Sequence, residues 1–216
     1  MTRHELLVIM TAGMSTIAGS VMVVYTTMLT PVYGAGLIGH FLTASLISIP
    51  AAIMFANMMI PSEEKTEFPQ NNSESLYSSS MDAITQGTKN GLEMFLNIIA
   101  MLIVVMALVF LINSILGLLP YFNGSAITLE LILGYIFAPL AWFMGIPWSE
   151  SIMAGQLLGI KTALNEFVAY INLADTATYE LGDKSRIIML YALCGFANFS
   201  SVGILLSGMS AMIPER

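Results

Sequence analysis

The residues of this sequence best placed to do chemistry are polar side chains that interrupt apolar stretches. Glu166 is a carboxylate within the mainly apolar residues 149–173, with Asn165 beside it and Lys161 five positions earlier. A carboxylate at membrane depth is costly, so it marks a functional site by default. The structural alternative is an ion pair with Lys161. Side chains at positions i and i+5 lie about 140° apart on an α-helix, which makes that pair poor.

A second group of polar residues lies in the last apolar stretch of the chain. Residues 194–201 read CGFANFSS and place Asn198, Ser200 and Ser201 in the middle of the stretch 187–213. Interrupted apolar segments that carry such groups are typical of discontinuous helices that hold a polar ligand near the middle of the membrane. This pattern predicts a binding site for a small polar solute.

No pattern of catalytic residues accompanies these groups. The sequence contains no HExxH, Walker A or GxSxG motif and no cluster with metal-ligand spacing. We therefore expect no enzyme activity and no cofactor. The single cysteine, Cys194, is expected to be a buried packing residue. A net charge of −7 excludes a basic nucleic-acid footprint, so no nucleic-acid partner is expected.

The surrounding sequence is that of a membrane protein. Hydrophobic residues make up 56% and charged residues 10% of the 216 residues, against roughly 25% charged residues in an ordinary globular domain. The charges are clustered, because residues 6–62, 94–129 and 187–214 contain no Asp, Glu, Lys or Arg. We expect an all-α, polytopic membrane protein with its helices in the bilayer.

The apolar stretches and their interruptions predict four regions. Residues 1–60 are expected to form two transmembrane helices, 61–80 a polar loop, 81–119 an interfacial helix and a transmembrane helix, and 120–216 the substrate-binding part. This last region is expected to contain interrupted transmembrane helices and a re-entrant helical hairpin. The hairpin is expected within residues 149–173, which are too few for two spans.

The first helix is also expected to be interrupted, because small residues gather at its middle. Its sequence there carries Gly13, Ser15, Thr16, Gly19 and Ser20. Such residues fit close helix packing, or an unwound segment whose carbonyl groups line an ion site. The sequence leaves both readings open.

Four segments together resemble the concentrative nucleoside transporter family. Residues 159–170, GIKTALNEFVAY, match the family signature G-x-K-x-x-x-N-E-F-V-A-Y at every fixed position. Residues 14–22 (MSTIAGSVM), 132–148 (ILGYIFAPLAWFMGIPW) and 194–201 (CGFANFSS) resemble further family segments in the expected order. The resemblance extends over essentially the whole chain, which corresponds to the C-terminal half of a family member.

The resemblance implies one half of an inverted-repeat elevator transporter that couples nucleoside movement to sodium ions or protons. A homotrimer in a bacterial inner membrane and a substrate such as uridine are expected. The family builds its site from two re-entrant hairpins. The first hairpin, which reads the base, is missing from this chain, so a separate N-terminal half is an expected partner.

The same resemblance assigns the nucleoside-binding residues. Glu166 matches a glutamate that binds the ribose, and a carboxylate, which only accepts hydrogen bonds, suits a vicinal diol whose two hydroxyls both donate. Asn198 and Ser201 match residues that contact the sugar, and Phe196 matches a phenylalanine that lies against the base. Asn165, beside Glu166, completes the expected set.

Two further residues match half of the family's sodium site. Thr16 would contribute its hydroxyl and Ile17 its carbonyl, although many sodium-using members have serine at the position of Thr16. The alternative to a symporter is a membrane remnant or structural subunit that moves nothing without a missing N-terminal half. An ion-conducting pore is a weaker alternative, because the sequence has no ring of like charges and no repeated filter motif.

Overall fold

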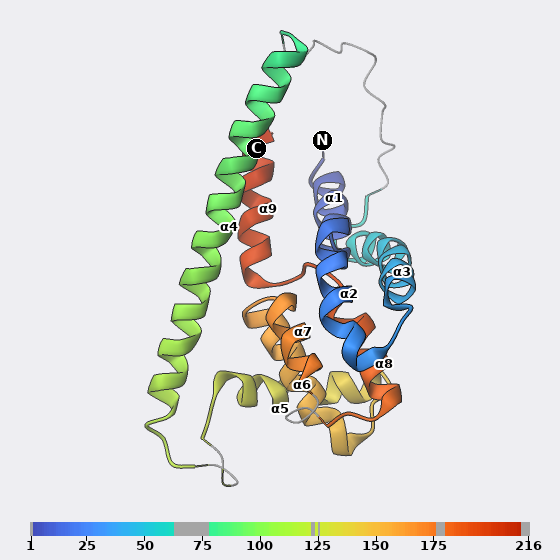
Figure 1. The fold of residues 1–216 in the computed structure, drawn as a ribbon, viewed down its shortest axis with the longest axis vertical. Coiled ribbons are helices and arrows are strands. Elements are labelled where there is room, and N and C mark those ends of the chain that lie inside the picture. The colour runs from blue at the N-terminus through green and yellow to red at the C-terminus, as the bar shows by residue number, and fades with distance from the viewer. Residues whose placement is uncertain (1, 63–77, 122–123, 125, 176–179, 213–216) are drawn as a thin grey trace.

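The computed structural model describes residues 2–62, 78–121, 124, 126–175 and 180–212, and every regular element assigned in them is a helix (Figure 1). The expected all-α class is confirmed. In chain order the helices are α1 (Arg3–Ser15), α2 (Gly19–Tyr33), α3 (Leu37–Met59), α4 (Ser80–Leu116), α5 (Leu129–Phe143), α6 (Trp148–Ala163), α7 (Glu166–Ala174), α8 (Asp183–Leu193) and α9 (Phe199–Met212).

The first apolar stretch forms two helices that are separated by a short break. A capping box between Thr2 and Glu5 starts α1, because their side chains satisfy backbone N–H groups that have no partner in the first turn. The helix ends where Thr16 takes an extended conformation, with φ −119° and ψ 165°. The chain becomes helical again at Gly19, so the break comprises residues 16–18.

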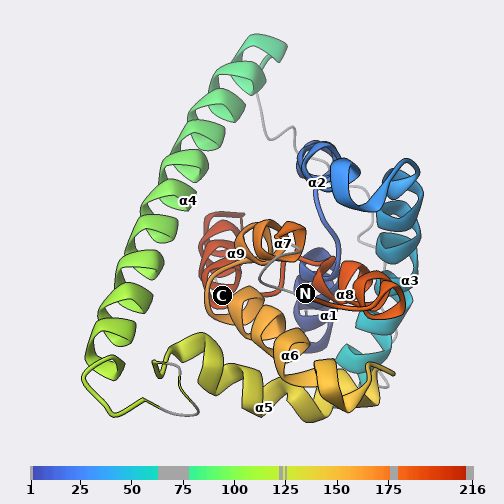
Figure 2. The same cartoon turned by 60° about the horizontal axis from the view of Figure 1, so that its bottom comes forward.

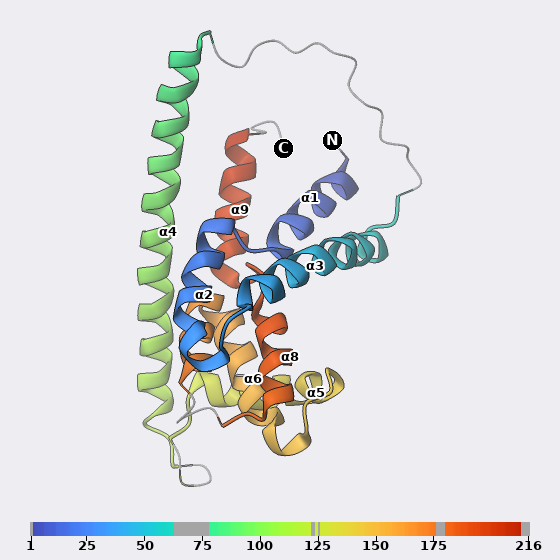
Figure 3. The ribbon, with the colours of Figure 1, turned by 45° about the vertical axis from the view of Figure 1, so that its right-hand side comes forward.

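Helix α4 joins what the sequence divides into an interfacial helix and a transmembrane helix. It runs without interruption for 37 residues, about 55 Å at 1.5 Å per residue. The polar start and the apolar section Leu102–Leu116 differ in composition, but no proline stands between them, so nothing forces the helix to end. Figures 1 and 3 show α4 along one edge of the molecule, with α9 beside it.

The substrate-binding region expected from the sequence contains helices α5 to α9. Helices α5 and α6 meet at a bend of 119° and pack closely, because a Cβ atom added at Gly155 would lie 2.9 Å from the Ala138 nitrogen. Helices α6 and α7 are joined by a tight turn at Leu164 and Asn165, within the residues expected to form the hairpin. Figure 2 shows α6 and α7 next to α8 and α9.

The last apolar stretch is also broken. Helix α8 ends at Leu193, and α9 begins at Phe199. Helix α8 starts at Asp183, four positions before the span expected from residue 187. The acidic side chain of Asp183 in the first turn favours this earlier start, since it complements the positive end of the helix dipole.

The length and composition of the helices agree with an integral membrane protein. Within the described residues, two helical stretches are long and apolar enough to cross a bilayer, Arg3–Tyr33 with its break and Leu37–Met59, and the bent pair α5–α6 would make a third. The 23 residues of α3 would span about 34 Å, enough for a hydrocarbon core of about 30 Å. Most of the polar loop expected at 61–80 lies outside the described residues.

Candidate functional site

Glu166 is the first residue of α7, and its side chain is 4% exposed. The Tyr25 hydroxyl donates to Oε1 at 3.0 Å, and the Asn198 Nδ2 donates to Oε2 at 3.1 Å. The two donors belong to α2 and to the break before α9, so three segments far apart in sequence meet at one carboxylate. The hydrogen-bonding partners of this buried acid are neutral donors.

Asn198 caps helix α9 and is held by it. Its Oδ1 accepts from the Ser201 backbone N–H at 2.8 Å and from the Ser200 hydroxyl at 2.6 Å. Because Oδ1 faces these two donors, the Nδ2 group must turn toward Glu166. One of its two N–H bonds points at Oε2, so Asn198 has a single further side-chain donor to offer.

Ser201 supports Asn198 from the first turn of α9 and is fully buried. Its hydroxyl accepts from the Asn198 N–H at 2.9 Å and donates to the Asn198 carbonyl at 2.8 Å. A hydroxyl has one proton and two lone pairs. In this arrangement, Ser201 can therefore accept one more hydrogen bond but cannot donate another.

Asn165 lies in the α6–α7 turn, and Phe196 lies in the α8–α9 break. Asn165 is the N-cap of α7, where its Oδ1 accepts from the Val168 N–H at 2.9 Å. Phe196 lies half-buried in the break between α8 and α9. The structure thus brings Glu166, Asn198 and Ser201 together, with Asn165 adjacent to Glu166 in the chain.

Lys161 has a different role from the ion pair weighed at the outset. Its Nζ donates to the Ala192 carbonyl at 2.9 Å, in the last turn of α8. Carbonyl groups at the end of a helix have no partner within the helix, and a positive charge there is favourable. Lys161 therefore caps α8 just before its break, while Tyr25 and Asn198 hydrogen-bond to Glu166.

The two residues expected to form half of a cation site lie at the other break. Thr16 is half-buried at the end of α1, and Ile17 is buried. A Cβ atom added at Gly195 would lie 3.2 Å from the carbonyl oxygen of Ser15, the last residue of α1, so the α8–α9 break lies against the end of α1 that leads into the α1–α2 break. No group of three or more His, Cys, Asp or Glu side chains that could hold a metal ion occurs in the described part of the chain.

Tyr25 is the residue of this site that the sequence did not single out. It lies on the buried face of α2 with Met22 and Leu29, at the spacing of an ordinary apolar helix face. A polar atom on such a face is the only signal that could have marked it, because a buried tyrosine hydroxyl needs a partner.

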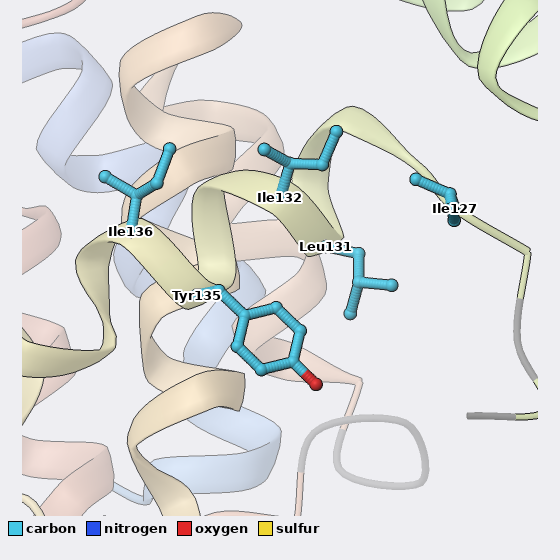
Figure 4. A pocket seen from close by; sticks show the side chains of 5 residues that line it. All are labelled: Ile127, Leu131, Ile132, Tyr135 and Ile136. Atoms are coloured by element: carbon cyan, nitrogen blue, oxygen red, sulfur yellow. The ribbon is translucent and has the colours of Figure 1, made fainter. Parts of the chain in front are cut away.

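An apolar cavity elsewhere in the molecule does not belong to the site. It has a volume of about 320 Å³ and is lined along α5 and the segment before it by Ile127, Leu131, Ile132, Tyr135 and Ile136 (Figure 4). None of these residues was expected to bind substrate.

Comparison with known proteins identifies the chain. The profile of a family described as "Na+ dependent nucleoside transporter C-terminus" matches residues 40–216. The chain belongs to this family. The assignment agrees with the motifs at 159–170 and 194–201, which lie at the buried carboxylate and at the break that faces it.

Full-length relatives extend the similarity to the whole chain. An "Uncharacterized transporter YutK" of Bacillus subtilis is 40% identical over 100% of this chain and 53% of its own length. A "Nucleoside permease NupC" of Helicobacter pylori is 36% identical, over 100% of this chain and 51% of its own length. The chain spans about half the length of these two relatives, whose names describe transport proteins and not enzymes.

The fold is shared with a solved transporter. The structure described as "CNTnw in an inward-facing substrate-bound state" superposes with a TM-score of 0.79 at 36% sequence identity, covering 100% of this chain and 51% of that one. The matching half of that structure therefore has the same fold as this chain. The integral membrane assignment rests on both the family and the apolar helices.

Proposed function

We propose that this chain is the C-terminal transport part of a nucleoside–cation symporter. Nucleoside would bind between the α6–α7 turn and the α8–α9 break, with its ribose at Glu166. The buried carboxylate of Glu166, held by two neutral donors from separate elements, is the observation that carries the proposal.

The hydrogen-bond capacity of the site fits a sugar. Two ribose hydroxyls can donate to the two carboxylate oxygens, because each oxygen has one protein donor and a second acceptor position. Asn198 offers a further N–H to a sugar oxygen, and Ser201 can accept from a hydroxyl. Phe196, half-buried in the same break, would provide an apolar surface for the base.

Transport would be coupled to sodium ions or protons at the α1–α2 break. Sodium is a hard cation and prefers oxygen ligands. The Thr16 hydroxyl and the Ile17 carbonyl would supply two, and the remaining ligands would come from the first hairpin of the family's inverted repeat. Contact between the end of α1 and Gly195 would place the ion close to the nucleoside-binding break.

The assembly we propose is a homotrimer in a bacterial inner membrane, in which an N-terminal half supplies the first hairpin. The α6–α7 pair would enter the membrane as the second, re-entrant hairpin. The alternative is a structural subunit or membrane remnant that transports nothing without an N-terminal half. The chain spans 51–53% of the length of these bacterial relatives.

Uptake of labelled uridine into proteoliposomes tests the proposal. The chain alone is compared with the chain co-expressed with the N-terminal half of a full-length relative, under an imposed sodium or proton gradient. We expect saturable, gradient-driven uptake only from the complemented chain. Uptake by the chain alone would contradict the need for a second half, and no uptake from either under both gradients would favour the structural subunit.

A further inference from the structure

Tyr25 places a hydroxyl group at the carboxylate that the proposed function assigns to ribose. Its side chain is 1% exposed, and its hydroxyl donates to Glu166 Oε1 at 3.0 Å. The contact links residues 141 positions apart, in α2 and α7. Tyr25 therefore links the helix that follows the proposed cation-side break to the proposed nucleoside-binding hairpin.

The ring of Tyr25 is fixed by its neighbours. Its centroid lies 4.7 Å from that of Tyr170 and 6.2 Å from that of Phe41, within the range of favourable aromatic pairs. A phenylalanine would fill the same space. The packing therefore accounts for the ring, and the hydroxyl requires a separate explanation, because burying it has a cost unless it is hydrogen-bonded.

The two donors to Glu166 fix the plane of the carboxylate. Tyr25 approaches Oε1 and Asn198 approaches Oε2, so neither oxygen can rotate away without losing a bond. With one donor on each oxygen, one acceptor position on each oxygen is left for a ligand. If Tyr25 lost its hydroxyl, the carboxylate would be held at Oε2 alone and could turn about its terminal bond.

We infer that Tyr25 is a positioning residue that selects for solutes with a vicinal diol by orienting Glu166. This inference rests on the proposed function. Tyr25 acts through the carboxylate, so its hydroxyl matters for a ligand with ribose hydroxyls and not for the same ligand without them. A purely structural tyrosine would affect both ligands alike.

The test compares binding of uridine and 2′,3′-dideoxyuridine to the complemented chain, with a cysteine-free N-terminal half. In Tyr25→Phe we expect uridine affinity to fall about tenfold, because the ligand must then fix the orientation of a carboxylate that is no longer held in advance, and dideoxyuridine affinity to stay within about twofold. The matched control is Tyr170→Phe, which removes an equally buried hydroxyl that donates to the Leu190 carbonyl at 2.8 Å. It should leave the ratio of the two affinities unchanged.

Folding of each variant is followed on the single buried cysteine, Cys194, whose reaction with a thiol dye reports unfolding. The double variant Tyr25→Phe/Glu166→Gln should bind uridine no more weakly than Glu166→Gln alone, because the hydroxyl acts only through the carboxylate. This variant also has no charged carboxylate that the missing hydroxyl would leave with a single side-chain donor, so the question can be answered if Tyr25→Phe does not fold.

The outcomes separate the two claims. An equal loss for both ligands, an unchanged uridine affinity, or additive effects in the double variant would overturn the role of Tyr25 and leave the proposed function intact. Failure of the unsubstituted complex to bind uridine, or to prefer it over dideoxyuridine, would overturn the proposed function and this inference with it.

Discussion

Two apolar stretches in the described residues form interrupted helices, at the α1–α2 break and at the α8–α9 break. The backbone groups at these two breaks are hydrogen-bonded in different ways. At the α8–α9 break, the N-terminus of α9 is capped by Asn198, with Ser200 and Ser201 bonded to it. At the α1–α2 break, the N-cap residue is Ala18, which makes no side-chain capping bond. Side chains therefore hydrogen-bond to the backbone at the α8–α9 break. The α1–α2 break has no such side-chain cap, and the Thr16 hydroxyl lies beside it.

This difference matches two kinds of ligand. A network in which most donors and acceptors are committed leaves a few defined positions, which suits a sugar whose hydroxyls have fixed directions. A break with backbone oxygens suits a small cation, which needs several oxygens at short range but little directional recognition. Gly195 lies against the end of α1, so the two breaks are close neighbours.

The largest effect on uridine binding is expected at Glu166, which accepts a hydrogen bond from Asn198. Glu166→Gln replaces one acceptor oxygen by a donor and removes the charge, so uridine affinity should fall roughly 10- to 150-fold. Isothermal titration with uridine and 2′-deoxyuridine measures this, and the deoxy compound should already bind more weakly to the unsubstituted complex. The control Glu150→Gln alters a carboxylate that accepts from the Gly182 N–H and should bind uridine normally. Normal binding by Glu166→Gln would contradict the ribose assignment.

An intermediate effect is expected at Gly195, where the α8–α9 break lies against the end of α1. Gly195 has φ +146°, and a Cβ there would lie 3.2 Å from the Ser15 carbonyl oxygen. Gly195→Ala should therefore destabilise the fold by about 1–3 kcal/mol. This would appear as a lower midpoint in a thermal unfolding scan. Gly87→Ala, in open space on α4, is the control and should be neutral or stabilising. Equal midpoints for the two variants would contradict both the strained backbone at Gly195 and its close approach to Ser15.

The class of the fold and the family could be predicted from sequence, because both depend on local patterns. Long uncharged stretches indicate membrane helices. The signature at residues 159–170 indicates the family. Glu166 could be recognised because placing a carboxylate within the membrane costs free energy. Helix α4 shows what composition alone could not predict. Its polar and apolar parts were expected to be two helices, but no proline separates them and they form one continuous helix.

The partners of Glu166 could not be predicted, because they depend on contacts between distant segments. Tyr25 lies 141 positions from Glu166 and sits at a regular place on an apolar helix face. Lys161 carried a visible charge, but its target is a backbone carbonyl at Ala192, and any residue type could supply that atom. Periodicity shows which face of a helix is buried, and only packing shows what that face meets.

The smallest effect is expected at the backbone-formed break. Thr16→Val keeps the shape of the side chain and removes its hydroxyl, one of several cation ligands. Without sodium, uridine affinity should stay within about twofold, as for a substitution that touches neither the ribose site nor the packing. When sodium is titrated, the sodium concentration that gives half-maximal uridine binding should rise about three- to tenfold, which corresponds to roughly 1 kcal/mol.

The control for this substitution is Thr11→Val, in the same helix, whose hydroxyl donates to the Leu7 carbonyl at 2.6 Å and takes no part in the break. It should leave the sodium dependence unchanged. An equal shift in both variants would mean that the effect comes from α1 as a whole and not from ion ligation. Uridine binding that ignores sodium in every variant but changes with pH would contradict a sodium site at Thr16 and favour protons as the coupling ion. The α8–α9 break could then still bind the sugar, but the assignment of sodium to the α1–α2 break would be wrong.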